Sequence, residues 1–303
     1  VYGISGGAAA FNFNFAFIDV DPQVKAGVGT NSNITATGNV TIQSATNHDA
    51  DGRVLAVSVG GAIFGASFVD VKVRPEVDTY VASGAVIDAG GTITLRSLHN
   101  RDALTFNPLT TTWTHLTDGG AVANDTVNRG ARAYGEAPSI GIFAGTLNII
   151  NATSNANIDT RVESGARLRS GSSVTVESRT VNDARVRAQA ESLAFASLGG
   201  ISTTAASQGT TKAHIDGSVK NASGTAAAAT NVTVRALTLG QAGAEGRTTN
   251  ARLGSDASDT VAKARVTPTL EASSGAGSTP RASCASSGRD GSAGDGRVCR
   301  DAG

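Results

Sequence analysis

Apolar and polar residues alternate one by one in many parts of the chain. Residues 11–17 read Phe-Asn-Phe-Asn-Phe-Ala-Phe, and residues 69–73 read Val-Asp-Val-Lys-Val. A period of two with many β-branched residues is typical of strands that bury one face. Segments rich in Gly, Asn, Asp and Ser separate these runs and predict turns, and the Ala-rich runs are interrupted by residues that disfavour helices. The pattern therefore predicts an all-β protein.

One five-residue element recurs along the chain: a β-branched residue, Asp, two further residues and an apolar residue. Clear copies occupy residues 20–24, 77–81, 158–162 and 215–219, and a degenerate copy occupies residues 266–270. Successive copies therefore begin 57, 81, 57 and 51 residues apart. A turn that ends in Gly follows every copy. The Asp residues that share one position of the element are Asp21, Asp78, Asp159 and Asp216.

Two further elements recur in the same order. A Val-Thr-Val-type strand begins at Val40, Ile93, Val174 and Val232, and an Asn/Asp turn follows the first three copies. A Gly-rich element occupies residues 4–7, 59–62, 140–143 and 198–201. Such self-similarity is the signature of repeat architectures, in which stacked units bury one continuous core. We predict a parallel β-solenoid (β-helix) of about four to five imperfect repeats, with an antiparallel sandwich or an array of small β-domains as alternatives.

The length of the repeat leads to further expectations. A unit of 51 to 57 residues is long for one coil, so we expect each unit to comprise two coils. The 81-residue interval exceeds its 57-residue neighbours by 24, about one coil of a β-helix, which predicts a complete extra coil around residues 104–138. The periodicity stops after Gly275. We therefore predict a repetitive solenoid over residues 1–275 and a low-complexity, disordered tail over residues 276–303.

Composition fits this architecture. Aromatic residues make up only 4% of the chain, and 37 Gly accompany many Ala, Thr and Ser, as a narrow core of small side chains requires. The net charge is zero, so nothing favours nucleic acid or an anionic membrane as a partner, and no run of 18 apolar residues predicts a spanning helix. The two cysteines, Cys284 and Cys299, lie in the tail. Because the chain begins with Val1 and has no Met, we expect a piece of a longer protein.

The strands GNVTIQS, GTITLRS and SSVTVES, with the ASG and ESG turns, resemble the giant repetitive adhesins of Gram-negative bacteria. The filamentous-haemagglutinin-like and leukotoxin-like adhesins are the most similar group, and the resemblance covers about residues 1–275. It implies an extracellular or cell-surface protein whose β-helical shaft serves attachment or display. The partner would be a host-cell or matrix protein or a glycan. We therefore expect a structural, monomeric shaft segment without catalysis, cofactor or membrane insertion.

The recurrent Asp residues raise an alternative function, because β-helical lyases and hydrolases use acidic clusters. A carbohydrate-active β-helix enzyme of this kind is the second hypothesis. The same position in every repeat favours a structural residue over four active sites. In addition, no GxSxG, P-loop or GxGxxG motif occurs in a strand–helix context. We assign no catalytic residue.

No metal site is assigned either. The four histidines, His48, His99, His115 and His214, show no HExxH-type spacing, and we interpret His48 and His99 as surface turn residues. Asp residues recur beside Asn at Asp49, Asp102 and Asp183, but the nine-residue Gly/Asp calcium repeat is absent. The single Trp, Trp113, could stack on a sugar ring or pack on the end of the core, and we favour packing.

Overall fold

The structure is a computed structural model that describes residues 1–100, 104–107, 112–115, 130–221, 231–252, 255–274 and 279–288. Throughout these ranges the regular secondary structure is β-strand, without a helix. The strands are β1 (Tyr2–Val20), β2 (Gln23–Val28), β3 (Asn33–Ala36), β4 (Val40–Thr46), β5 (Asp49–Val73), β6 (Glu76–Val81), β7 (Val86–Ala89), β8 (Ile93–His99), β9 (Leu104–Asn107), β10 (Thr112–His115), β11 (Gly130–Val162), β12 (Arg167–Ser170), β13 (Ser173–Ile215), β14 (Ser218–Asn221), β15 (Asn231–Arg252), β16 (Asp256–Ser274) and β17 (Thr279–Gly288).

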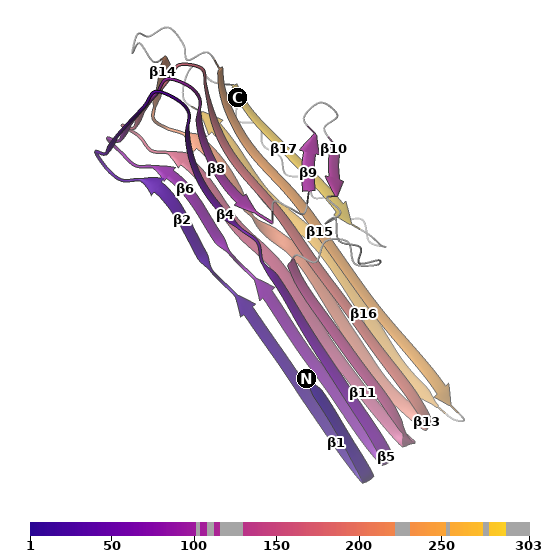
Figure 1. Cartoon of the computed structure of the whole chain (residues 1–303). Coiled ribbons are helices and arrows are strands. Elements are labelled where there is room, and N and C mark those ends of the chain that lie inside the picture. The colour runs from indigo at the N-terminus through magenta and orange to yellow at the C-terminus, as the bar shows by residue number, and fades with distance from the viewer. Residues whose placement is uncertain are drawn as a thin grey trace.

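Parallel pairing joins strands of successive repeats. The long strands lie in the order β1-β5-β11-β13-β15, and β16 also pairs with β13 (Figure 1). The short strands follow the same order, as β2-β6-β11, β4-β8-β13 and β3-β7-β12-β14. Every one of these pairs is parallel. The predicted parallel β-solenoid is therefore confirmed.

The long strands β1, β5, β11 and β13 each run to the far end of the molecule, bend and return, whereas β15 and β16 each form one arm (Figure 1). The two halves of one strand face each other: a Cβ on Gly52 would lie 2.7 Å from a methyl carbon of Val71, and a Cβ on Gly135 would lie 2.9 Å from Cγ1 of Ile150. A coil is thus a flattened loop of two long arms. Its other end is closed by the short strands, such as β2, β3 and β4 in the first coil.

One repeat forms one coil, so the prediction of two coils per repeat was wrong. Val40 pairs with Ile93, 53 positions later, and Ala131 pairs with Ala184, again 53 positions later. A strand in the next coil is therefore reached only after the chain has travelled along both arms. The long arms explain why a single coil needs so many residues, since strands rise only about 3.3 Å per residue.

The predicted extra coil at residues 104–138 was also wrong. Strand β11 pairs directly with β5, with Gly130 beside Asp49, 81 residues earlier, which leaves no place for a coil between them. Asn100, which follows β8, and Gly130, which begins β11, both have positive φ, 50° and 137°. Both are bonded to His48, whose N–H donates to Asn100 Oδ1 and whose carbonyl accepts from the Gly130 N–H. Within the insertion, β9 and β10 pair as an antiparallel hairpin.

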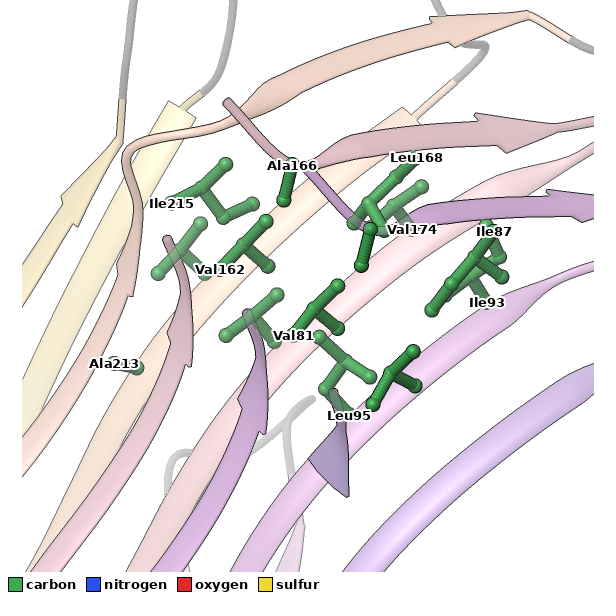
Figure 2. Packing of buried hydrophobic residues seen from close by; sticks show 14 of the residues in the cluster. Val81, Ile87, Ile93, Leu95, Val162, Ala166, Leu168, Val174, Ala213 and Ile215 are labelled. Carbon is green, nitrogen blue, oxygen red and sulfur yellow. The ribbon is translucent and has the colours of Figure 1, made fainter. Parts of the chain in front are cut away.

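The apolar core lies in the closed part of the coils, where Val, Ile, Leu and Ala of successive coils stack on one another. Val81, Val162 and Ile215 form one row, and Ile87 and Leu168 form another (Figure 2). All five are buried. The expected narrow core of small and β-branched side chains is thus present, and it is continuous from coil to coil.

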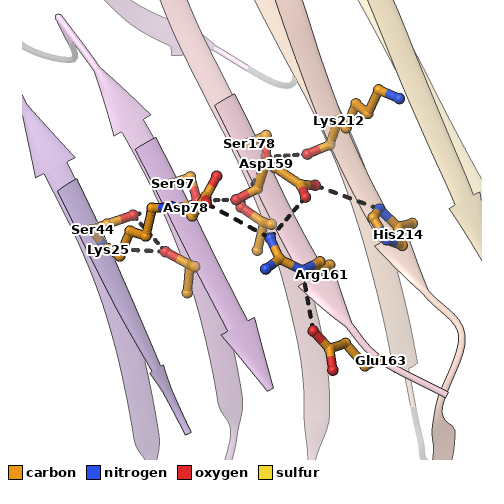
Figure 3. Close-up of polar contacts among 12 residues, drawn as sticks. Lys25, Ser44, Asp78, Ser97, Asp159, Arg161, Glu163, Ser178, Lys212 and His214 are labelled. Atoms are coloured by element: carbon orange, nitrogen blue, oxygen red, sulfur yellow. Dashed lines mark hydrogen bonds and ion pairs between the residues drawn. The ribbon is translucent and has the colours of Figure 1, made fainter. Parts of the chain in front are cut away.

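Rows of Ser and Thr run beside this core. Ser44 Oγ lies 2.6 Å from Thr79 Oγ1, Ser97 Oγ donates to the carbonyl of Asp159 at 2.6 Å, and Ser178 Oγ donates to Thr160 Oγ1 at 2.8 Å. These hydroxyl groups are buried, so each bond removes the cost of a buried polar group without a partner. The last residue of the GNVTIQS-type strands is therefore a cross-link between the two layers of a coil (Figure 3).

The predicted disordered tail contains one strand of the structure. Strand β17 (Thr279–Gly288) pairs in parallel with β15, whereas the sequence predicted disorder from residue 276 onward. Residues 275–278 and 289–303 lie outside the described residues, so the domain boundary at residue 275 stays a prediction.

The bends stack so closely that a side chain on Gly60 does not fit. Gly7, Gly60 and Gly141 occupy one register position, and a Cβ on Gly60 would overlap the carbonyl oxygen of Gly7. We expect Gly60→Ala to lower the free energy of unfolding by about 2 kcal/mol, because hydrogen-bonded coils cannot move apart. Gly38→Ala is the control, since nothing lies within 4 Å of its added Cβ. Equal urea midpoints for the two variants would contradict this close packing.

Candidate interaction surface

The recurrent Asp residues are the basis of the enzyme hypothesis. Asp78 and Asp159 do lie side by side on neighbouring strands, facing outward. Lys25 Nζ lies 3.5 Å from Asp78, and the Arg161 guanidinium lies 3.0 Å from Asp159 and 3.9 Å from Asp78 (Figure 3). His214 Nδ1 lies 3.5 Å from the other oxygen of Asp159. These carboxylates are therefore matched by basic side chains within the stack.

The other two members of the Asp set are out of register, so the predicted equal positions were wrong for them. Val20 pairs with Val73 and not with Val77, and Ile215 pairs with Val162 and not with Ile158. Both displacements are four residues, the difference between the 57-residue spacing of the motif and the 53-residue coil. An even displacement keeps every side chain on its own face of the strand, so the copies look equivalent in the sequence. Asp21 and Asp216 therefore do not extend the row of Asp78 and Asp159.

The fourth Gly-rich copy is also out of register, here by five residues. Gly199 pairs with Thr146 on the returning arm, whereas Leu193 and Ala194 pair with Ile140 and Gly141 at the bend. The prediction of a third Asn/Asp turn was also wrong, because residues 182–184 lie inside β13. By contrast, the Val-Thr-Val strands pair in the register that the sequence indicates, through Val40–Ile93, Ile93–Val174 and Val174–Val232.

Arg161 holds the outward acidic pair together. Partial burial lowers the pKa of Arg161, but hydrogen bonds and the negative charges of Asp159, Asp78 and Glu163 outweigh it and raise that pKa above its ordinary value. The guanidinium also lies 5.2 Å from the centroid of the Tyr80 ring, within the range of a cation–π contact. A permanently charged Arg between two carboxylates is typical of a structural ion-pair network.

A second charged row lies on β8, β13 and β15. The Glu177 side chain is only 3% exposed, and three guanidinium groups lie near its oxygens: Arg179 at 2.9 Å, Arg96 at 3.3 Å and Arg235 at 3.4 Å. Arg96, Glu177 and Arg235 share one register position in three successive coils. This row connects the coils electrostatically.

His99 was predicted to be a surface turn residue, and this prediction was wrong. Its side chain is fully buried, Nδ1 lies 3.0 Å from Thr180 Oγ1, and its ring stacks on His48 with centroids 5.9 Å apart. Burial and the nearby His48 lower the pKa of His99 to about 3, and burial also lowers the pKa of His48. The two rings stack instead of converging on a common point, and within the described ranges no three His, Cys, Asp or Glu side chains could hold a metal ion.

Five further candidates remain, and the structure places the side chains of only two of them. Asp183 lies inside β13 and forms an ion pair with Arg185 at 3.1 Å, and Asp49 begins β5. Trp113 and His115 belong to β10, but their side chains are outside the described part of the structure, as is Asp102. The packing role predicted for Trp113 therefore stays a prediction.

Sequence reasoning missed the most unusual surface, an aromatic row on the returning arm of the first coil. Phe11, Phe13, Phe15 and Phe17 point outward and are 50–72% exposed. The alternate residues Asn12 and Asn14 point inward and are buried. Asn12 Nδ2 donates to the carbonyl of Gly3 at 2.7 Å, and Asn14 Nδ2 donates to Asn12 Oδ1 at 2.8 Å.

The second coil continues this row. Phe64 and Phe68 pair with Phe11 and Phe15, and the rings of Phe15 and Phe68 stack with centroids 5.0 Å apart. We call the outward residues Phe11, Phe13, Phe15, Phe17, Phe64 and Phe68 the aromatic stripe. The alternating phenylalanines were the available signal, but alternation alone does not say which face is outside.

A second apolar surface lies at the bends. Val59, Ile140 and Leu193 share one register position there and are about half exposed, as are the neighbouring Ile142 and Phe195. Together with Ala251 and the adjacent glycines they line a shallow groove of about 780 Å³. We call these five residues the bend patch.

The interior beneath these surfaces contains buried polar side chains beside a small apolar cluster of Ala10, Ile63, Ala144 and Ala194. Ser58, Ser67, Ser139 and Asn148 are buried between the arms, and Asn148 Nδ2 donates to the carbonyl of Gln189 at 3.2 Å. The far halves of the arms thus bury several small polar side chains, while many of their large apolar side chains lie outside. The usual distribution in soluble domains is the reverse, which marks these outer surfaces as candidates for binding.

Comparisons with protein-family models, with curated proteins and with solved structures found no match. The resemblance to filamentous-haemagglutinin-like adhesins therefore stays an expectation from the sequence. No helix in the ranges that the structure covers is long and apolar enough to span a membrane.

Proposed function

We propose that this chain is a shaft segment of a large bacterial adhesin, located at the cell surface or secreted, and that it acts in attachment or display without catalysis. The observation that carries the proposal is the continuous parallel stack of five coils, from β1 through β5, β11 and β13 to β15 and β16. In such a stack each coil contacts only its neighbours, so the architecture suits a long spacer. The strand and turn motifs that resemble filamentous adhesins support the same function.

The ion pairs on the outer surface are further support. A carbohydrate-active enzyme would need acidic groups free to act on a substrate, but Asp78 and Asp159 are occupied by Lys25, Arg161 and His214. The partner in attachment would be a host-cell or matrix protein or a glycan, and nothing in the charge of the chain favours nucleic acid.

The test combines attachment with catalysis. Beads coated with the purified chain are expected to remain on cultured epithelial cells or on matrix protein several-fold more often than albumin-coated beads under flow. The same chain is expected to release no unsaturated sugar from pectate or alginate. Release of such a product, abolished by Asp159→Asn, would overturn the proposal in favour of a lyase. If the chain shows no attachment and no cleavage, the segment is only a spacer.

A further inference from the structure

The aromatic stripe needs a covering surface. Four rings of the first coil lie in one row on alternate residues of β1, and two rings of β5 extend the row sideways. Leu147 and Ile149 of β11 pair with Ala66 and Phe68 and continue the apolar character into the third coil. Contiguous apolar patches of this kind are uncommon on monomeric soluble proteins unless they bind something.

The stripe has defined ends. Beyond Phe17 the outward positions become charged, with Asp70 beside Phe17 and Lys72 beside Asp19. At the far side of the stack, Asp259 and Lys263 of β16 occupy the same outer face. An apolar centre with a charged rim is the usual anatomy of a protein–protein interface.

The exposed area is sufficient for a stable pair. Phe11, Phe13, Phe15 and Phe17 are 69%, 53%, 50% and 72% exposed. Because each ring residue offers about 200 Å², these four alone expose roughly 500 Å². Two facing copies would bury about 1,000 Å² in total before Phe64, Phe68, Leu147 and Ile149 are added, which reaches the size of specific interfaces.

Lipid is a less suitable cover for this face. The nearby basic groups are already paired, with Lys72 Nζ 2.7 Å from Asp70 and Arg74 2.6 Å from Asp19, and cannot attract anionic headgroups.

We propose that two copies of this chain pack face to face through the aromatic stripe, related by a twofold axis. The two sheets would lie about 10 Å apart with their rings interdigitated, as in sheet-on-sheet packing. The same surface of each copy forms the contact, as a twofold interface requires. This departs from the single-chain shaft expected from the sequence, and it does not depend on whether the shaft attaches to cells.

Sedimentation equilibrium on the full chain tests the pairing. The wild type is expected to be dimeric at micromolar concentration. Phe13→Lys with Phe15→Lys, and separately Phe13→Glu with Phe15→Glu, should weaken the dimer by about 100-fold or more, because buried aromatic anchors carry most interface affinity. Mixing the Lys variant with the Glu variant should restore a dimer, since the two stripes would then carry opposite charges.

Leu193→Lys with Phe195→Lys is the matched control, because it places the same charges on the bend patch. It is expected to remain dimeric. All four substituted side chains are exposed, so every variant is expected to keep its strands. Circular dichroism verifies this. A monomeric wild type, charged stripe variants that stay dimeric, or a mixture that stays monomeric would each overturn the proposal. A monomeric wild type that floats with phosphatidylcholine vesicles would assign the stripe to lipid instead.

Discussion

Glu177→Ala is expected to lower the free energy of unfolding by about 3 kcal/mol. The carboxylate is almost fully buried and is the common partner of Arg96, Arg179 and Arg235. Without it, three positive charges from three successive coils would face one another with no counter-charge. The arginines are 21–40% exposed, which places the expected cost at the lower end of the range for a broken buried ion pair.

Glu271→Ala is the matched control for this loss. Glu271 pairs with Lys212 at 3.1 Å, but its side chain is half exposed, so its removal should cost less than about 1 kcal/mol. Urea unfolding followed by circular dichroism measures both variants. If Glu177→Ala unfolds at the same urea concentration as Glu271→Ala, the arginine row does not stabilise the stack.

Acidification from pH 7 to pH 5 is expected to cost the fold about 2 kcal/mol through His99 alone. The pKa of His99 is about 3 in the folded chain, whereas the ordinary value is 6.5. As the pH falls below 6.5, the unfolded chain takes up a proton that the folded chain refuses. The stabilisation is therefore complete above pH 6.5 and is lost progressively as the pH falls toward 3.

His99→Gln isolates this effect. The variant loses the packing of the ring and is expected to be less stable at pH 7, but its stability should change less between pH 7 and pH 5. This interval lies above the ordinary pKa values of the carboxylates, which titrate at lower pH. Unfolding midpoints measured at both pH values provide the comparison. Equal pH dependence in the variant and the wild type would show that His99 is accessible to protons.

The sequence alone determined the class of fold and part of its register. Alternation of apolar and polar residues located the strands, and the recurring order of three elements predicted the stacked coils. The Val-Thr-Val strands gave the pairing of Val40, Ile93, Val174 and Val232 correctly. They did so because their inward residues belong to the closed apolar core, where a displaced side chain would leave a cavity.

Only the tertiary structure decided the shape of a coil, the register of the Asp elements and the direction of the phenylalanines. The Asp copies at 57-residue spacing differ from the 53-residue coil by four, and an even difference leaves no trace in the alternation. The phenylalanines point outward because the facing arm is too close: a Cβ on Gly3 would already lie 2.6 Å from Asn12 Oδ1. The alternation of residues along a strand shows which residues share a face, but the distance between the arms decides which face is inside.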